Sequence, residues 1–118
     1  MQIKHIYSIK VDGSGNVYAA GAFTNDSGYS YVAKWDGVNW NELGIGNSSL
    51  KANNVIASIA LDGLGNVYAA GDFSNVNGYR YVAKWDGISW SELTILKNGN
   101  PIYNSITVDG FNNIYATG

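Results

Sequence analysis

The chain has 118 residues, of which 14% are charged, with a net charge of −2 at pH 7, 15 glycines and no cysteine. This length excludes a second large domain, and the few charges with many glycines and aromatic residues exclude a disordered or coiled-coil chain. The scattered lysines and arginines form no basic patch for nucleic acid or a membrane surface, and the absence of cysteine excludes disulfides and cysteine-bound zinc.

The first 43 residues are predicted to form four short β-strands. Glycine and asparagine mark the turns, and the segments between them are rich in β-branched and aromatic residues. In chain order the predicted strands are Ser8–Val11, Val17–Gly21, Tyr31–Trp35 and Trp40–Leu43, and Gly44–Asn54 connects them to the next segment. No stretch has the apolar spacing of an amphipathic helix over more than one turn, so we expect almost no helix.

The same pattern then recurs along the chain. Ile6–Leu43 and Ile56–Leu93 are identical at 26 of 38 positions at an offset of 50 residues, without a gap. A third, partial copy begins near Ile106, at an offset of 47. We therefore divide the single domain, 1–118, into repeat 1 at about 3–52, repeat 2 at about 53–102 and a partial repeat 3 at about 103–118. A sequence that repeats so closely has been duplicated recently or designed.

Four antiparallel strands repeated every 40 to 50 residues are typical of β-propeller blades. Val17–Gly21 is apolar on both faces, as expected for a sheet pressed between two neighbours. Gly21 and Gly71 are expected at points of close backbone approach. The predicted fold class is therefore all-β, with four-stranded antiparallel propeller blades, about two and a half per chain.

Two motifs carry a resemblance to known proteins. Tyr-Val-Ala-Lys-Trp-Asp-Gly-x-x-Trp-x-Glu-Leu at 31–43 and 81–93 resembles the WDG-x-x-W repeats of prokaryotic β-propeller proteins. Val-Asp-Gly-x-Gly-Asn-Val-Tyr at 11–18 is also similar to bacterial NHL-type repeats. The resemblance implies a propeller fold. It also implies a binding platform that is often extracellular or surface-attached, and only some propellers are enzymes.

Closure of the ring requires more blades than one chain has. Propellers close with roughly 4–8 blades. An open array that left about 500 Å² of apolar surface in water would lose on the order of 12 kcal/mol of stabilising free energy, at about 25 cal/mol for each Å² of apolar surface that is buried. We therefore expect the ring to close by homo-oligomerisation, with a dimer favoured over a trimer, unless the piece belongs to a longer array.

Several polar groups are candidates for chemical sites. Asp12-x-Ser14-x-Asn16 resembles the start of a calcium loop, but Val17 and Phe23 stand where such a loop needs Gly and Glu, so a turn is favoured. Asp36 and Asp86 are expected to cap turns, because one copy per repeat keeps the two carboxylates apart. No catalytic role is expected for the remaining groups. Lys34 and Lys84 are expected to be strand-edge residues, and His5 lies near the amino terminus. We predict no catalytic residues, no metal, no cofactor and no enzyme activity.

The loops between strands are the remaining candidates for binding. The repeats agree in their strands but differ in these loops, where Asp26 corresponds to Val76 and Ser30 to Arg80. Aromatic and amide side chains together suit a sugar. The candidate ligand-binding residues are Asn25, Asp26, Tyr29, Asn77, Tyr79 and Arg80. The favoured function is a self-assembling structural scaffold, and the alternative is a glycan- or protein-binding module of a secreted or cell-surface propeller. No nucleic-acid or membrane partner is expected: no apolar run reaches the length of a membrane span, and Met1–Lys10 lacks a signal peptide pattern, which leaves the compartment open.

Overall fold

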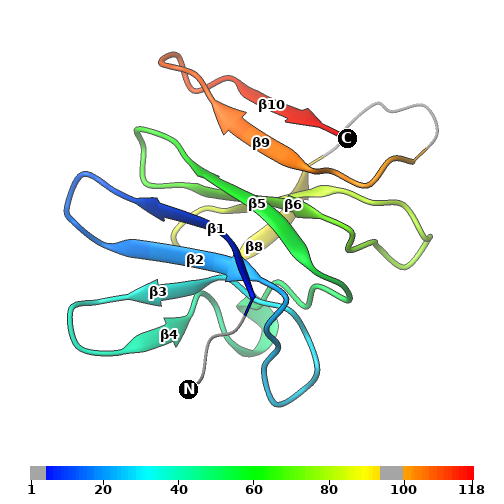
Figure 1. Ribbon diagram of the computed structural model, residues 1–118, viewed down its shortest axis with the longest axis horizontal. Helices are drawn as coiled ribbons and strands as arrows, with labels where there is room; N and C mark the ends of the chain where they lie inside the picture. Colours follow the sequence, from blue (N-terminus) through cyan, green and yellow to red (C-terminus); the bar gives the residue numbers. More distant parts are fainter. Residues whose placement is uncertain (1–4, 94–99) are drawn as a thin grey trace.

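The computed structural model describes residues 5–93 and 100–118, and within them the fold is all-β, as predicted. Two four-stranded antiparallel sheets follow each other, and a two-stranded sheet comes last (Figure 1). The first sheet comprises β1 (Ile6–Val11), β2 (Val17–Gly21), β3 (Ala33–Trp35) and β4 (Trp40–Glu42). The second comprises β5 (Ile56–Leu61), β6 (Val67–Gly71), β7 (Val82–Trp85) and β8 (Trp90–Leu93), and the third β9 (Ser105–Val108) and β10 (Ile114–Thr117).

Strand order follows chain order in both complete sheets, so each is a simple meander. The bounds predicted for Val17–Gly21 are confirmed, whereas β1 begins two residues earlier than predicted and β3 two residues later. Pairing continues beyond the end of β4, because the Leu43 N–H donates to the Val32 carbonyl at 2.8 Å. The one helical element in the described residues is a single 3₁₀ turn, Gly46–Ser48. None of the described helices is long and apolar enough to cross a membrane.

The two complete sheets have the same register. Val17 is paired with Trp35 and Val67 with Trp85, and both sheets have an irregularity at the start of the first strand pair. Since paired residues in a sheet project from the same face, each sheet has two defined faces. We call the face of Tyr18 and Ala20, and its equivalents in the other sheets, the forward face. We call the opposite face, which carries Ile9 and Ala19, the rear face.

The forward face of each sheet packs on the rear face of the next. Tyr18, Ala20 and Val32 share one apolar cluster with the second sheet's Ile56 and Ile59. A second cluster joins the forward face of the second sheet to the rear face of the third, and its members are Ala60, Tyr68, Ala70, Val82, Tyr103 and Ile106. The core of the molecule therefore consists of two successive sheet-to-sheet interfaces of the same kind.

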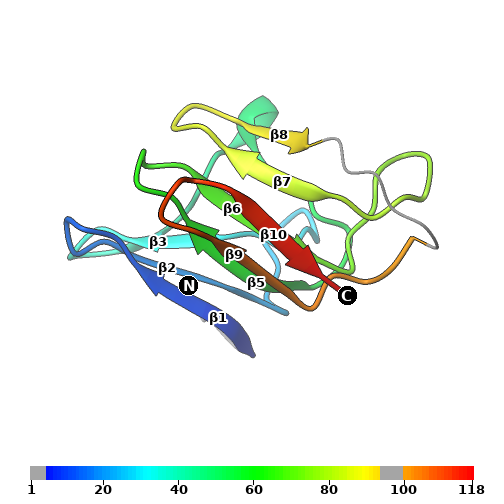
Figure 2. The same ribbon diagram turned by 90° about the horizontal axis from the view of Figure 1, so that it is seen from above.

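The first strands of the sheets gather on one side of the molecule. β1 contacts β5, and β5 contacts β9, while β4 and β8 lie at the far edges of their sheets (Figure 1). Seen from above, β9 and β10 cover β5 and β6, and β7 and β8 extend beyond them (Figure 2). The third sheet therefore covers only part of the forward face of the second.

The predicted close approach at Gly21 and Gly71 is present. A Cβ atom on Gly21 would collide with the carbonyl oxygen of His5, and one on Gly71 with the carbonyl of Val55. Gly118 has the same relationship to the carbonyl of Ile102. Gly21 and Gly71 end the second strand of their sheets and Gly118 directly follows β10, so this position holds the segment before the first strand close to the end of the second.

Candidate functional site

The loop between β2 and β3 is built around Asn25. The Asn25 side-chain oxygen accepts hydrogen bonds from the N–H groups of Ser27 (3.0 Å) and Tyr29 (3.1 Å). Its amide nitrogen donates to the Glu42 carboxylate at 3.1 Å, which ties the loop to β4. Gly28 has a φ of 85°, a conformation that glycine adopts without strain. The Asn25 amide is therefore used to shape the loop.

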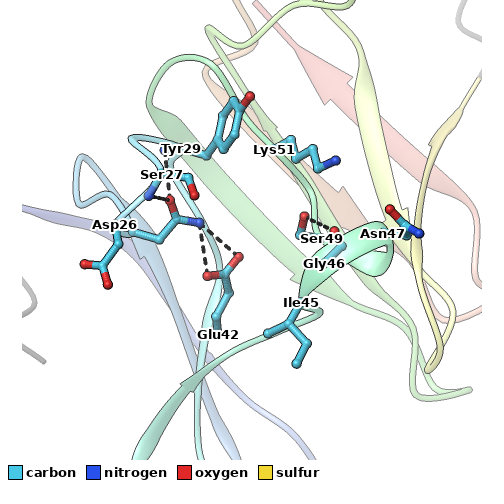
Figure 3. Close-up of a pocket in the computed structure, with 10 residues that line it drawn as sticks. Asp26, Ser27, Tyr29, Glu42, Ile45, Gly46, Asn47, Ser49 and Lys51 are labelled. Atoms are coloured by element: carbon cyan, nitrogen blue, oxygen red, sulfur yellow. Dashed lines mark hydrogen bonds between the residues drawn. The ribbon is translucent and has the colours of Figure 1, made fainter.

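A surface hollow of about 420 Å³ lies beside this loop (Figure 3). One wall comes from the β2–β3 loop and β4, and the other from the segment that follows β4. Its lining residues are Asn25, Asp26, Ser27, Tyr29, Glu42, Ile45, Gly46, Asn47, Ser49 and Lys51. Three of the predicted binding residues, Asn25, Asp26 and Tyr29, thus lie together at one hollow.

The hollow combines acidic groups with one cation and one phenol ring. Asp26 is exposed at its rim, while Glu42 is half-buried between Asn25 and the wall. Burial, together with the charges of Glu42 and Asp26, raises the pKa of the neighbouring Tyr31. Lys51 and Tyr29 lie on the side of the hollow that faces the second sheet (Figure 3). These groups can hydrogen-bond and stack on a polar ligand, but they form no acid and base pair aimed at one point.

The other three predicted residues lie on the equivalent loop of the second sheet. Asn75 repeats the role of Asn25, because its side chain accepts the N–H groups of Asn77 (3.0 Å) and Tyr79 (3.1 Å) and donates to Glu92 (3.0 Å). The Tyr79 side chain is 62% exposed. The wall that would correspond to Ile45–Ser49 falls at 95–99, outside the described residues.

Arg80 is held by the fold. Its Nε is 2.7 Å from the Asp72 carboxylate, and a terminal nitrogen donates to the Asn100 carbonyl at 3.0 Å. The Arg80 backbone N–H also donates to the Asn100 side chain at 2.7 Å. These bonds tie the β6–β7 loop to the segment that leads to β9.

The sequence did not single out Glu42, Asn47 or Lys51, although all three line the hollow. The sequence contained a pattern that could have identified Glu42, because the Trp-x-Glu-Leu motif recurs with Glu92. In the structure both carboxylates accept a hydrogen bond from an asparagine 17 residues earlier. Asn47 and Lys51 belong to the connection between repeats, where the sequence has no periodic pattern.

The Asp12 segment forms a turn, as favoured over a calcium loop. The Asp12 carboxylate accepts hydrogen bonds from the Ser14 and Asn16 N–H groups (both 2.9 Å), the Asn16 side chain (3.0 Å) and the Tyr18 hydroxyl (3.1 Å). Asp62 and Asp109 repeat this arrangement. Hydrogen bonds from Asn16 lower the pKa of Asp12, while burial and the bond to Asp12 raise the pKa of Tyr18 to about 12.

Asp36 and Asp86 also cap turns. Asp36 accepts the N–H groups of Val38 (2.9 Å) and Asn39 (2.8 Å), and Asp86 accepts those of Ile88 and Ser89. Within residues 5–93 and 100–118, no three His, Cys, Asp or Glu side chains are grouped so as to hold a metal ion.

The rear face of the first sheet is the second candidate site. Ile6, Ile9 and Val11 are 45%, 55% and 63% exposed. Their equivalents in the second sheet are Ile56 and Ile59, which are both fully buried, and Leu61, which is packed against the core. The outer part of the same face is covered by its own side chains, since Phe23, Tyr31 and Ala33 cluster with Trp40. The open apolar surface is therefore concentrated on β1.

No protein-family model matches the chain, and no curated protein matches it.

Proposed function

We propose that the chain is a β-propeller module that closes its ring by self-assembly and serves as a structural scaffold. The observation that carries this proposal is the contrast between equivalent positions. Ile56 and Ile59 are buried because the first sheet covers them, whereas Ile6 and Ile9 are about half exposed. An isoleucine side chain contributes roughly 1.5–3 kcal/mol on full burial, so this face favours association.

The arrangement of the sheets supports propeller geometry. Each forward face packs on the next rear face, and the first strands lie side by side. Sheets that repeat one such step about an axis form a ring when the steps add to a full turn. The three sheets of the described residues are too few to close a ring, since propellers have roughly 4–8 blades.

We infer the number of copies by counting the two-stranded third sheet as one blade position. Two chains in head-to-tail order give six blade positions, two of which lack their third and fourth strands. Three chains would give nine positions if every sheet took part, which exceeds the usual range. A dimer is therefore favoured over a trimer whose β9–β10 segments are displaced.

The mass of the intact chain in solution tests the proposal. Native mass spectrometry and light scattering should give one discrete multimer, twice the chain mass, over a wide range of protein concentration. Ile9→Lys should shift the protein towards the monomer, because it places a charge on the open face. Val38→Lys is the matched control, since Val38 is 74% exposed on a turn. A stable monomer at high concentration would overturn the proposal.

A second candidate function is binding of a glycan or a protein segment at the hollow beside β4. It rests on the placement of Asp26, Tyr29 and Lys51 around a single hollow. Tyr29→Ala should remove retention on a glycan array, while Val38→Ala, at an exposed position outside the hollow, should leave it unchanged. If the intact protein retains no glycan and no peptide, this function is excluded.

A further inference from the structure

A specific hydrogen bond joins successive sheets. The Ser8 hydroxyl on the forward face of β1 accepts the backbone N–H of Ile59 in β5, at 3.1 Å. The Ser58 hydroxyl in β5 accepts the N–H of Ile106 in β9, also at 3.1 Å. Both bonds join the first strand of one sheet to the first strand of the next. The same bond is therefore made at both interfaces within the chain.

The register explains why this bond repeats. Ser8 is paired with Ala20, Ser58 with Ala70 and Ser105 with Thr117, so all three serines lie on forward faces. β5 is an edge strand, and the Ile59 N–H is directed from that edge to a serine of the sheet before it. A serine hydroxyl thus satisfies a backbone donor that strand pairing leaves open.

A donor and an acceptor equivalent to those of this hydrogen bond lie on the first and the third sheet. Ile9 is paired with Ala19 as Ile59 is with Ala69, so the Ile9 N–H is placed like that of Ile59, but none of the sheets in residues 5–93 and 100–118 covers it. Ser105 is placed like Ser8 and Ser58, and it is exposed on the outer side of the third sheet. The first sheet therefore has the donor and the third sheet the acceptor.

On the basis of the proposed self-assembly, we propose that the rear face of β1 docks on the forward face of β9–β10 in a second copy, where the Ile9 N–H donates to Ser105. The occupant of the open face is thus a second copy of this chain, in head-to-tail order. The contact continues the series of interfaces already present inside the chain.

Tyr115 supports this choice of surface. Tyr18 and Tyr68 are 7% and 3% exposed, because each lies under the next sheet. Tyr115 occupies the same position, donates to Asp109 at 3.1 Å as the other two donate to Asp12 and Asp62, and is 54% exposed. The outer face of the third sheet thus presents a ring already fixed in the orientation that the internal interfaces use.

Engineered disulfides test the geometry, because the chain has no native cysteine. The double variant Ile9→Cys/Ser105→Cys places the two thiols at opposite ends of one chain, so a bond between them joins different copies. Ser58→Cys/Ile106→Cys is the control for the geometry of the equivalent internal pair. After oxidation, the double variant should run on a denaturing gel as covalently joined chains, up to the number of chains in the ring.

The single variants separate the possible arrangements. Neither Ile9→Cys nor Ser105→Cys alone should give joined chains. If Ile9→Cys alone joins two chains, the rear faces pack on each other and the head-to-tail contact is wrong. If the double variant stays unlinked while the control pair links and the mass shows a multimer, this contact is also wrong although self-assembly stands. A monomeric mass would overturn the proposed function itself.

A milder substitution measures the hydrogen bond. Ser105→Ala should weaken association about five-fold, in line with a typical net contribution of about 1 kcal/mol for one hydrogen bond. Ser91→Ala, at an exposed position of β8, should leave association unchanged. An unchanged dissociation constant for Ser105→Ala would show that the serine takes no part in the contact.

Discussion

The indole N–H of Trp90 donates to the carbonyl oxygen of Leu43 at 2.7 Å, which ties the last strand of the second sheet to the end of the first. Trp90 also packs against the apolar cluster that contains Leu43 and Leu50 from the first repeat. The outer edges of the two sheets are therefore fixed to each other by a directed bond as well as by apolar contact.

Trp90→Phe should lower the free energy of unfolding by about 1–3 kcal/mol, because a half-buried carbonyl loses its donor and part of the ring contact is lost. Trp40→Phe is the matched control, since no such bond to Trp40 is present within the described residues. Urea denaturation at one fixed protein concentration gives both values. Equal losses for the two variants would show that the bond to Leu43 contributes nothing.

Gly71→Ala should destabilise the protein by about 1–3 kcal/mol, the usual cost of forcing extra atoms into a packed site. The new Cβ would lie 2.8 Å from the Ala57 nitrogen and 3.0 Å from the Ile56 Cα, both of which belong to the backbone and yield little. Gly13→Ala has open space around the added carbon, so its midpoint of thermal unfolding should hardly change.

Stability should fall at both ends of the pH range. The pKa values of Asp12, Asp36, Asp62, Asp86 and Asp109 are lowered in the fold. The stabilisation that these carboxylates provide is present above their unfolded pKa of about 3.9, and it is lost as the pH falls through the lower folded values.

At alkaline pH the loss of stability comes from the ionisation of buried tyrosines. Tyr18 and Tyr68 have pKa values raised to about 12, first by burial and then by their bonds to Asp12 and Asp62. Their contribution is full below pH about 10 and is lost as the pH rises through 12. Urea midpoints measured from pH 2.5 to 11.5 should show a plateau between these limits. The alkaline loss should be smaller in Tyr18→Phe/Tyr68→Phe.

Thr117→Ala should strengthen association if the forward face of the third sheet is the docking surface. The equivalent residues Ala20 and Ala70 are completely buried at the internal interfaces, so the larger, polar threonine holds the opposing sheet further away. Sedimentation at several concentrations would give the dissociation constant. Weaker association of the alanine variant would argue against a close contact at this position.

The strands were readable from the sequence because turn residues and apolar runs are local signals. The bounds of Val17–Gly21 and the turn at Asp12 depend on residues within a few positions of each other, and both predictions are confirmed. The pairing of β1 with β2 and of β3 with β4 follows from the same pattern, since successive strands joined by short turns pair with each other.

The candidate site was harder to predict from the sequence than the strands, because it depends on contacts between distant segments. The sequence identified Asn25 and Tyr29, but the bond from Asn25 to Glu42 and the wall formed by Asn47 and Lys51 arise only when β4 folds back beside the loop. Arg80 looked available for a ligand, yet Asp72 and Asn100 hold it. The loop composition thus gave the location of the hollow and only part of its lining.

The turn made by Asp12, Asn16 and Tyr18 is completed by residues from a span of seven positions. Because the hydrogen bonds of this turn all come from one hairpin, a gene that gains or loses one repeat still encodes complete turns. Copy number can therefore change in a single genetic event without interrupting the hydrogen bonds of a turn. The same independence would allow the chain to be lengthened by one repeat at a time.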